Sequence, residues 1–245
     1  MAKPWVTLDR INTYEGALEL RQRGAKDFLI TLGGLVLMNS LANRSEVVLG
    51  QLGCRHLTNH PAPRVLVGGL GMGYTLRAIL DCLPATAQVV VAEINPAVVE
   101  WCRGPLALLT DSAVEDPRVT VEIRDVAELV GDCAQAATKD RFDAVVFDLY
   151  KGPHYRTDKI NDPLYGSKAI NNVRDCLKPE GLFTVWGENY DAGFDRRLRA
   201  AGFTARSERP GRGGERHGVF VTLKKDHRLR GCIGHVIARE PLHQG

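Results

Sequence analysis

The stretch Pro63-Arg-Val-Leu-Val-Gly-Gly-Leu-Gly-Met-Gly-Tyr-Thr-Leu-Arg77 decides the fold of this chain. Its first half is a continuous apolar run, which is typical of a strand covered on both faces of a sheet. Its second half begins a helical pattern. A buried strand that turns through glycines into a helix predicts an open α/β sheet, in which ligands bind beyond the carboxyl ends of the strands. Gly69, Gly71 and Gly73 would let the backbone approach such a ligand, because they carry no Cβ.

Strands and helices alternate along the rest of the central region. The patterns predict further strands at 88–93, 119–123, 142–148, 182–186 and 217–223, and helices at 75–83, 96–102, 168–177 and 194–201. Alternation of this kind requires right-handed crossovers and predicts a doubly wound α/β sheet.

The N-terminal region has a different pattern. Short strands are predicted at 18–23, 27–32 and 35–38 around glycine turns, followed by a helix that Ser45 could cap. The chain therefore divides into a small N-terminal β domain with its linking helix (1–60), a nucleoside-binding domain (61–223) and a C-terminal tail (224–245).

The composition excludes several classes of protein. The 245 residues are 44% hydrophobic and 25% charged, which excludes a disordered chain, a collagen and a coiled coil. A net charge of +3 gives no reason to expect a nucleic acid or a membrane as partner. The opening MAKPWVTLDR lacks the apolar run of a signal peptide, and the six cysteines are scattered without zinc-finger spacing. We expect a cytoplasmic protein with reduced cysteines and no metal.

Acidic residues end three of the predicted strands. Glu93 follows the glycine turn by about 20 residues, where a carboxylate can bind both hydroxyls of a ribose. Asp125 could accept from the exocyclic amine of adenine while the Val126 backbone reads the edge of the ring. Asp148 faces the same crevice. Each acid could instead cap a helix or lie in a solvated loop, but their joint placement at successive strand ends indicates an adenine-nucleoside site.

NAD is the rival ligand for such a site, since it too has a ribose for an acidic residue to bind. The strict G-x-G-x-x-G spacing of dinucleotide sites fails here. Its last glycine would fall on Tyr74 counted from Gly69, or on Leu76 counted from Gly71.

Taken together, these motifs resemble those of the spermidine synthase family. The glycine stretch, the strand end Ala92-Glu-Ile-Asn-Pro and the run Phe142-Asp-Ala-Val-Val-Phe-Asp148 stand in the family's order, and the resemblance extends over residues 18–223. It implies a sheet like that of S-adenosylmethionine (SAM) methyltransferases, preceded by a small β domain. It also implies a transferase of polyamine biosynthesis that moves an aminopropyl group from decarboxylated SAM to a diamine. Such enzymes commonly form dimers or tetramers, and we expect a homodimer.

The resemblance also implies roles for individual residues. The nucleoside would be contacted by Gly69, Gly71, Gly73, Glu93, Asp125 and Val126. Asp148 would lie beside the reacting centre, where a carboxylate can accept the proton of the attacking amine. The next residues, Tyr150, Lys151, His154 and Tyr155, would line the acceptor site unless they belong to a surface loop. We take Asp148, Tyr150 and Lys151 as the catalytic candidates.

Acids that hold the polyamine in that family are replaced here. A gap-free alignment places Met72 and Lys151 where the family has Asp, and Gln51 where it has Glu. Because a diamine is a dication, Lys151 would repel it by about 1 kcal/mol or more at short range. The small-molecule acceptor is therefore not identified. The alternatives to aminopropyl transfer are SAM-dependent methyl transfer and nucleoside binding without catalysis.

The end of the chain resembles a second family. The segment from Gly218 to Leu242, with the motif Leu229-Arg-Gly-Cys-Ile-Gly, is similar to part of an AMMECR-type domain. Fewer than 30 residues are too few to hold a domain core. We interpret them as an appended tail, in which Cys232 is an ordinary cysteine or a reactive thiol beside Arg230.

Overall fold

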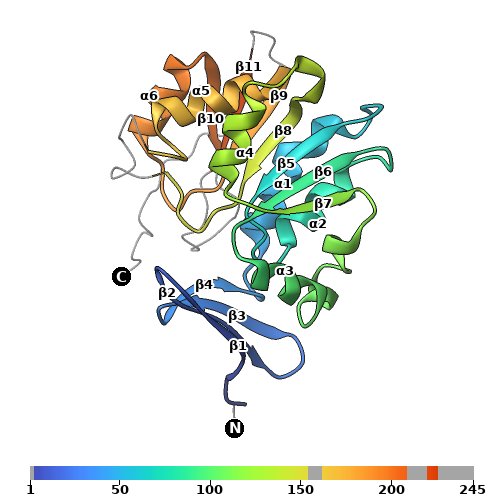
Figure 1. Ribbon diagram of the computed structural model, residues 1–245, viewed down its shortest axis with the longest axis vertical. Coiled ribbons are helices and arrows are strands. Elements are labelled where there is room, and N and C mark those ends of the chain that lie inside the picture. The colour runs from blue at the N-terminus through green and yellow to red at the C-terminus, as the bar shows by residue number, and fades with distance from the viewer. Residues whose placement is uncertain (1–2, 154–161, 209–219, 226–245) are drawn as a thin grey trace, which may run out of the picture.

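The protein is described from a computed structural model, which covers residues 3–153, 162–208 and 220–225. Two sheets make up the fold (Figure 1). The first is an antiparallel meander of β1 (Val6–Thr13), β2 (Gly16–Arg23), β3 (Asp27–Leu32) and β4 (Leu35–Asn39). It lies beside the larger sheet near α3, where the Trp101 indole N–H donates to the Asp9 carboxylate at 2.7 Å.

The second sheet has seven strands in the order β10-β11-β9-β8-β5-β6-β7. Its strands are β5 (Arg64–Gly68), β6 (Gln88–Glu93), β7 (Val119–Ile123), β8 (Phe142–Phe147), β9 (Leu177–Val185), β10 (Phe203–Glu208) and β11 (Phe220–Lys225). The strands from β7 to β9 pair in parallel, whereas β11 is antiparallel to both of its neighbours. The predicted doubly wound α/β architecture with a small N-terminal β sheet is confirmed.

Six α-helices flank these strands. They are α1 (Arg44–Cys54), α2 (Tyr74–Cys82), α3 (Pro96–Arg103), α4 (Val126–Cys133), α5 (Ser167–Cys176) and α6 (Ala192–Ala200) among the described residues. Alternate side chains of β5 enter two different cores: Val65 and Val67 pack with α1, α2 and α3, and Leu66 packs with α4, α5 and α6. The continuous apolar run of this strand therefore reflects burial on both faces, as predicted.

Several local predictions were wrong. The N-terminal strand β1 and the elements α4 and β10 were not predicted. Asn43, not Ser45, is the N-cap residue of α1, and the Ser45 hydroxyl donates to the Glu46 carboxylate at 2.6 Å instead. The elements that were not predicted share a cause, because neighbouring strands and helices stabilise elements whose own sequence patterns are weak.

The predicted break between α5 and the following strand is also wrong. Strand β9 already begins at Leu177, which pairs with Phe142 of β8. The register then shifts so that the next recorded pair is Ala144 with Leu182. The Lys-Pro-Glu-Gly segment is thus accommodated as an irregularity within the strand, with Glu180 at φ 62°.

Candidate nucleoside and acceptor site

The glycine turn after β5 can be formed only by glycines. Gly69, Gly71 and Gly73 have φ values of 88°, 53° and 81°, in the left-handed region that side chains disfavour. A Cβ at Gly69 would lie 2.4 Å from the Asp148 carbonyl oxygen, and one at Gly71 would lie 2.5 Å from the Met38 sulfur. The turn is therefore held closely between the end of β8 and strand β4 of the small sheet.

Glu93 fixes the other side of this turn. Its carboxylate accepts a hydrogen bond from the Leu70 N–H at 3.0 Å and another from the Asn95 N–H at 2.9 Å. The side chain is only 7% exposed, and burial raises the pKa of this carboxyl. Each carboxylate oxygen keeps a second lone pair, so Glu93 remains able to accept from ligand hydroxyls.

Asp125 is the N-cap of α4, where it accepts from the Ala127 N–H at 2.8 Å. Asp125 therefore caps a helix, which was one of the two roles considered for it from the sequence. Its second carboxylate oxygen makes none of the hydrogen bonds recorded for the described residues. The Val126 side chain is buried against Gly68, where an added Cβ would lie 2.9 Å away.

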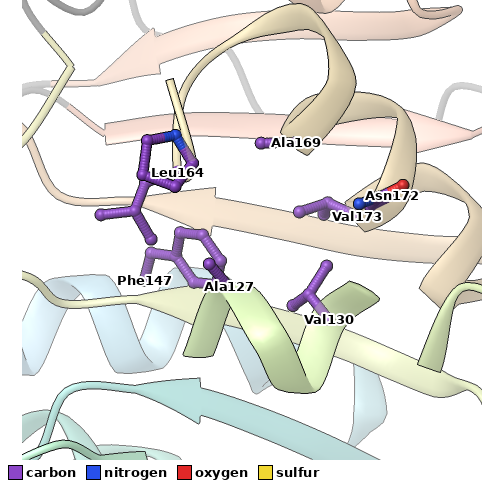
Figure 2. A pocket seen from close by; sticks show the side chains of 8 residues that line it. Ala127, Val130, Phe147, Leu164, Ala169, Asn172 and Val173 are labelled. Atoms are coloured by element: carbon purple, nitrogen blue, oxygen red, sulfur yellow. The ribbon is translucent and has the colours of Figure 1, made fainter. Parts of the chain in front are cut away.

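A small pocket lined mostly by apolar side chains, open to solvent, begins next to this helix start. Figure 2 shows its side chains converging from α4, the end of β8 and the α5 region. The lining residues are Ala127, Val130, Phe147, Pro163, Leu164, Ala169, Asn172 and Val173. One polar side chain among apolar ones suits a flat, largely apolar group.

Asp148 follows β8 directly, and its N–H donates to the Gly68 carbonyl at 2.9 Å. Its carboxyl lies 2.5 Å from the Thr75 hydroxyl at the start of α2. Burial, together with the negative charge of Glu46, raises the pKa of Asp148 to about 7, although the Thr75 hydrogen bond opposes the shift. A carboxyl that titrates near neutral pH can both accept and release a proton under physiological conditions.

Tyr150 and Lys151 both bind an acidic residue, which the sequence did not lead us to expect for the lysine. Both side chains donate to the carboxylate of Glu15, in the turn between β1 and β2. The ion pair holds the pKa of Glu15 below its usual range and raises that of Lys151. The expectation that Lys151 brings an uncompensated positive charge is therefore wrong, because an acid distant in sequence neutralises it.

Two other replaced positions lie in different surroundings. The Met72 side chain is fully buried and packs in the apolar core. Gln51 is exposed on α1. His154 and Tyr155 lie outside the described residues.

Three residues of this region were missed by the sequence reasoning. Thr75 and Glu46 lie beside Asp148, and Glu15 holds the loop that follows it. Only Thr75, next to the glycine turn, had a sequence signal that could have been used. The acids on α1 and in the β1–β2 turn reach the site through tertiary packing.

Two absences apply to the described residues only. Residues 3–153, 162–208 and 220–225 contain no group of three or more His, Cys, Asp or Glu side chains that could hold a metal ion. Over the same ranges, every helix is too short or too polar to cross a membrane.

Comparison with known proteins identifies two family models along the chain. The spermine/spermidine synthase domain matches residues 50–192, and AMMECR1 matches residues 191–245. The second match begins upstream of the segment recognised in the sequence and includes α6 and β10. Cys232 and the rest of residues 226–245 lie outside the described structure.

Curated relatives match the central region. The polyamine aminopropyltransferase of Clostridium tetani is 33% identical over 135 residues, which cover 54% of this chain and 43% of that protein. The polyamine aminopropyltransferase of Synechococcus sp. (strain JA-2-3B'a(2-13)) is 33% identical over 126 residues, or 50% of this chain and 36% of that protein. The chain thus spans less than half the length of these relatives.

Solved structures match over more of the chain. Spermidine synthase from Thermotoga maritima superposes with a TM-score of 0.65 at 21% identity, covering 90% of this chain and 73% of that one. A spermidine synthase in complex with the transition state analogue AdoDATO gives a TM-score of 0.64 at 20% identity, covering 90% and 72%. The fold is therefore the SAM-methyltransferase-like fold of these proteins.

Proposed function

The chain belongs to the spermine/spermidine synthase family, and on that premise we propose that it transfers an aminopropyl group from decarboxylated SAM to an amine. The observation that supports this most is the junction of the two halves of the site. The glycine turn contacts Glu93 on one side and the backbone of Asp148 on the other. A nucleoside held by the first half would present its sulfonium to the second.

The donor half offers groups that match each part of the nucleoside. The Glu93 carboxylate would accept from both ribose hydroxyls. The free oxygen of Asp125 would accept from the adenine amine, with the Val126 backbone at the edge of the ring. The ring itself would lie at the start of α4, at the mouth of the small pocket lined by Ala127.

The acceptor half would supply the base. The neutral amine attacks the carbon next to the sulfonium, the carbon–sulfur bond breaks, and its electron pair leaves on the sulfur as methylthioadenosine. The new ammonium loses a proton, which the ionised Asp148 carboxylate accepts. A carboxyl titrating near pH 7 suits that step, since it is largely ionised slightly above neutral pH.

Binding is tested first, by calorimetric titration of methylthioadenosine. Glu93→Gln should weaken its affinity at least roughly tenfold, because two charge-assisted hydrogen bonds become neutral ones. Glu100→Gln, on the exposed face of α3, is the matched control and should leave affinity unchanged. Equal affinities in wild type and both variants would refute the nucleoside site.

Turnover is tested by mass spectrometry with a panel of amines and both nucleosides. Release of methylthioadenosine that Asp148→Asn abolishes supports the proposal, with the exposed Asp132→Asn as control. Release of S-adenosylhomocysteine from SAM would establish methyl transfer instead, an alternative left open by Met72 at the position where the family has an acid. Nucleoside binding without turnover would make the chain a binding protein.

The proposal includes a homodimer that acts in the cytoplasm on a small-molecule acceptor without a metal, as expected from the sequence. Sedimentation of the purified full chain tests the dimer, and activity in the presence of a chelator tests the metal.

A further inference from the structure

The Thr75 hydroxyl lies between two acceptors. Its oxygen is 2.5 Å from a carboxyl oxygen of Asp148 and 3.2 Å from the backbone carbonyl oxygen of Glu46. A hydroxyl has one proton to donate and two lone pairs with which to accept. Thr75 cannot donate to both neighbours at once, so the partner it chooses depends on where the other protons are.

Two arrangements satisfy this geometry. When Asp148 is ionised, Thr75 donates to the carboxylate, and the short distance suits a charge-assisted bond. When Asp148 is protonated, its own O–H donates to Thr75, and Thr75 turns its proton to the Glu46 carbonyl. The heavy atoms need not move between these states, since the hydrogen bond between Thr75 and Asp148 reverses its direction while the bond from Thr75 to the Glu46 carbonyl forms.

Packing holds the hydroxyl in this position. Thr75 is 2% exposed, and a Cβ on Gly50 of α1 would lie 2.7 Å from the Thr75 carbonyl oxygen. Helices α1 and α2 are therefore in direct contact at this point. Neither helix can withdraw from Asp148 without separating from the other.

The charged surroundings make both protonation states of Asp148 accessible. Burial opposes ionisation most, the charge of Glu46 on α1 adds to it, and the Thr75 hydrogen bond favours ionisation. Burial raises the pKa of Tyr165, with the charges of Asp162 and Asp148 adding to the shift, and its hydroxyl donates to the Lys151 carbonyl at 2.7 Å. Lys151 itself is held by Glu15.

We propose that Thr75 is a positioning residue, which holds the Asp148 carboxyl by a hydrogen bond and couples its protonation state to the Glu46 carbonyl, because protonation of Asp148 reverses that bond and turns the Thr75 proton to the carbonyl. The inference rests on the proposed function only in the use that the enzyme makes of Asp148. The hydrogen-bond relay is a property of the protein without substrates.

The test compares Thr75→Val, which keeps the shape but removes the hydroxyl, with Thr75→Ser, which restores it. The titration of the Asp148 carboxyl carbon is followed by NMR in the ligand-free full chain, with assignment from the signal lost in Asp148→Asn. Thr75→Val should raise the midpoint by roughly 1 pH unit, because the ionised form loses its hydrogen bond. Thr75→Ser should titrate like wild type.

An unchanged midpoint in Thr75→Val, or a serine variant that behaves like the valine variant, would overturn the proposal. If Thr75→Val does not fold, Thr75→Ala must show the same upward shift. The pH profile of turnover should move in the same direction as the midpoint. Because the NMR titration needs no substrate, loss of the proposed activity and loss of the relay are separate outcomes.

Discussion

The Lys151 ammonium is ion-paired with Glu15, so the turn between β1 and β2 is tied to the loop that follows Asp148. Through this pair the turn of the small N-terminal sheet places an acid beside the loop that follows Asp148. Any cationic acceptor approaching Asp148 would therefore meet a lysine whose charge is already compensated.

Replacement of Glu15 should change KM for the acceptor more than it changes the free energy of unfolding. In Glu15→Gln, Lys151 becomes a free cation, and we expect KM for a diamine acceptor to rise several-fold. Stability should fall by less than about 1 kcal/mol, because the lysine side chain is 58% exposed. Steady-state kinetics and urea unfolding check both parts. Glu19→Gln, which breaks a pair with Arg10 on the same sheet, is the control. Similar kinetics in the two variants would contradict the prediction.

The raised pKa of Asp148 should make the ligand-free protein less stable as pH rises. Its folded pKa is about 7, above the ordinary value of 3.8, so the folded state holds the proton more tightly between these values. Unfolding free energy should then decrease from about pH 4 to pH 7, in total by roughly 2–4 kcal/mol from this group.

Chemical denaturation at several pH values measures this dependence. Asp148→Asn should flatten that part of the profile and be more stable than wild type at pH 8, whereas the exposed Asp132→Asn should follow wild type. If the profiles of wild type and Asp148→Asn run parallel, the carboxyl is not held protonated by the fold.

Two glycines on helices should respond to alanine with opposite signs. At Gly50 the added methyl would meet the Thr75 carbonyl at 2.7 Å and the Ala78 Cβ at 2.9 Å, so we expect a loss of about 2–3 kcal/mol. At Gly131 on α4 the nearest atom is 3.9 Å away, and the better helix propensity should add about 0.5–1 kcal/mol. Thermal unfolding of both variants checks the signs, and a tolerated Gly50→Ala would mean that α1 and α2 can separate.

Arg118 should contribute strongly to stability although it lies far from the site. Its guanidinium donates to the Leu80 and Leu83 carbonyls at the end of α2, each at 2.9 Å, and it pairs with Asp116. Arg118→Ala should cost about 2–3 kcal/mol, because helix-end carbonyls lose their donor. The pKa of Asp116, held at about 2 by this arginine, should rise in the variant, which an NMR titration detects. Arg103→Ala, on the exposed face of α3, should unfold like wild type.

Much of the fold and of the donor half was predictable from sequence, because their signals are local. A strand buried on both faces, a glycine turn and a helix adjoin within the segment Pro63–Arg77. The acids Glu93, Asp125 and Asp148 each stand at a strand end, and parallel strands bring such ends to one edge of a sheet. The order of residues alone therefore placed these groups together.

Tertiary structure alone decided the acceptor half. Glu15 and Lys151 are separated by 136 residues along the chain, and Thr75 and Asp148 by 73. No local pattern links such pairs, because their contact depends on how the small sheet and α1 pack against the carboxyl ends of β5 and β8. Likewise, the sequence shows Met72 where the family has an acid, but only the structure shows that this side chain is buried. The sequence determined that the residues of the proposed nucleoside site stand at neighbouring strand ends, and packing between distant segments determined the charges that surround Asp148.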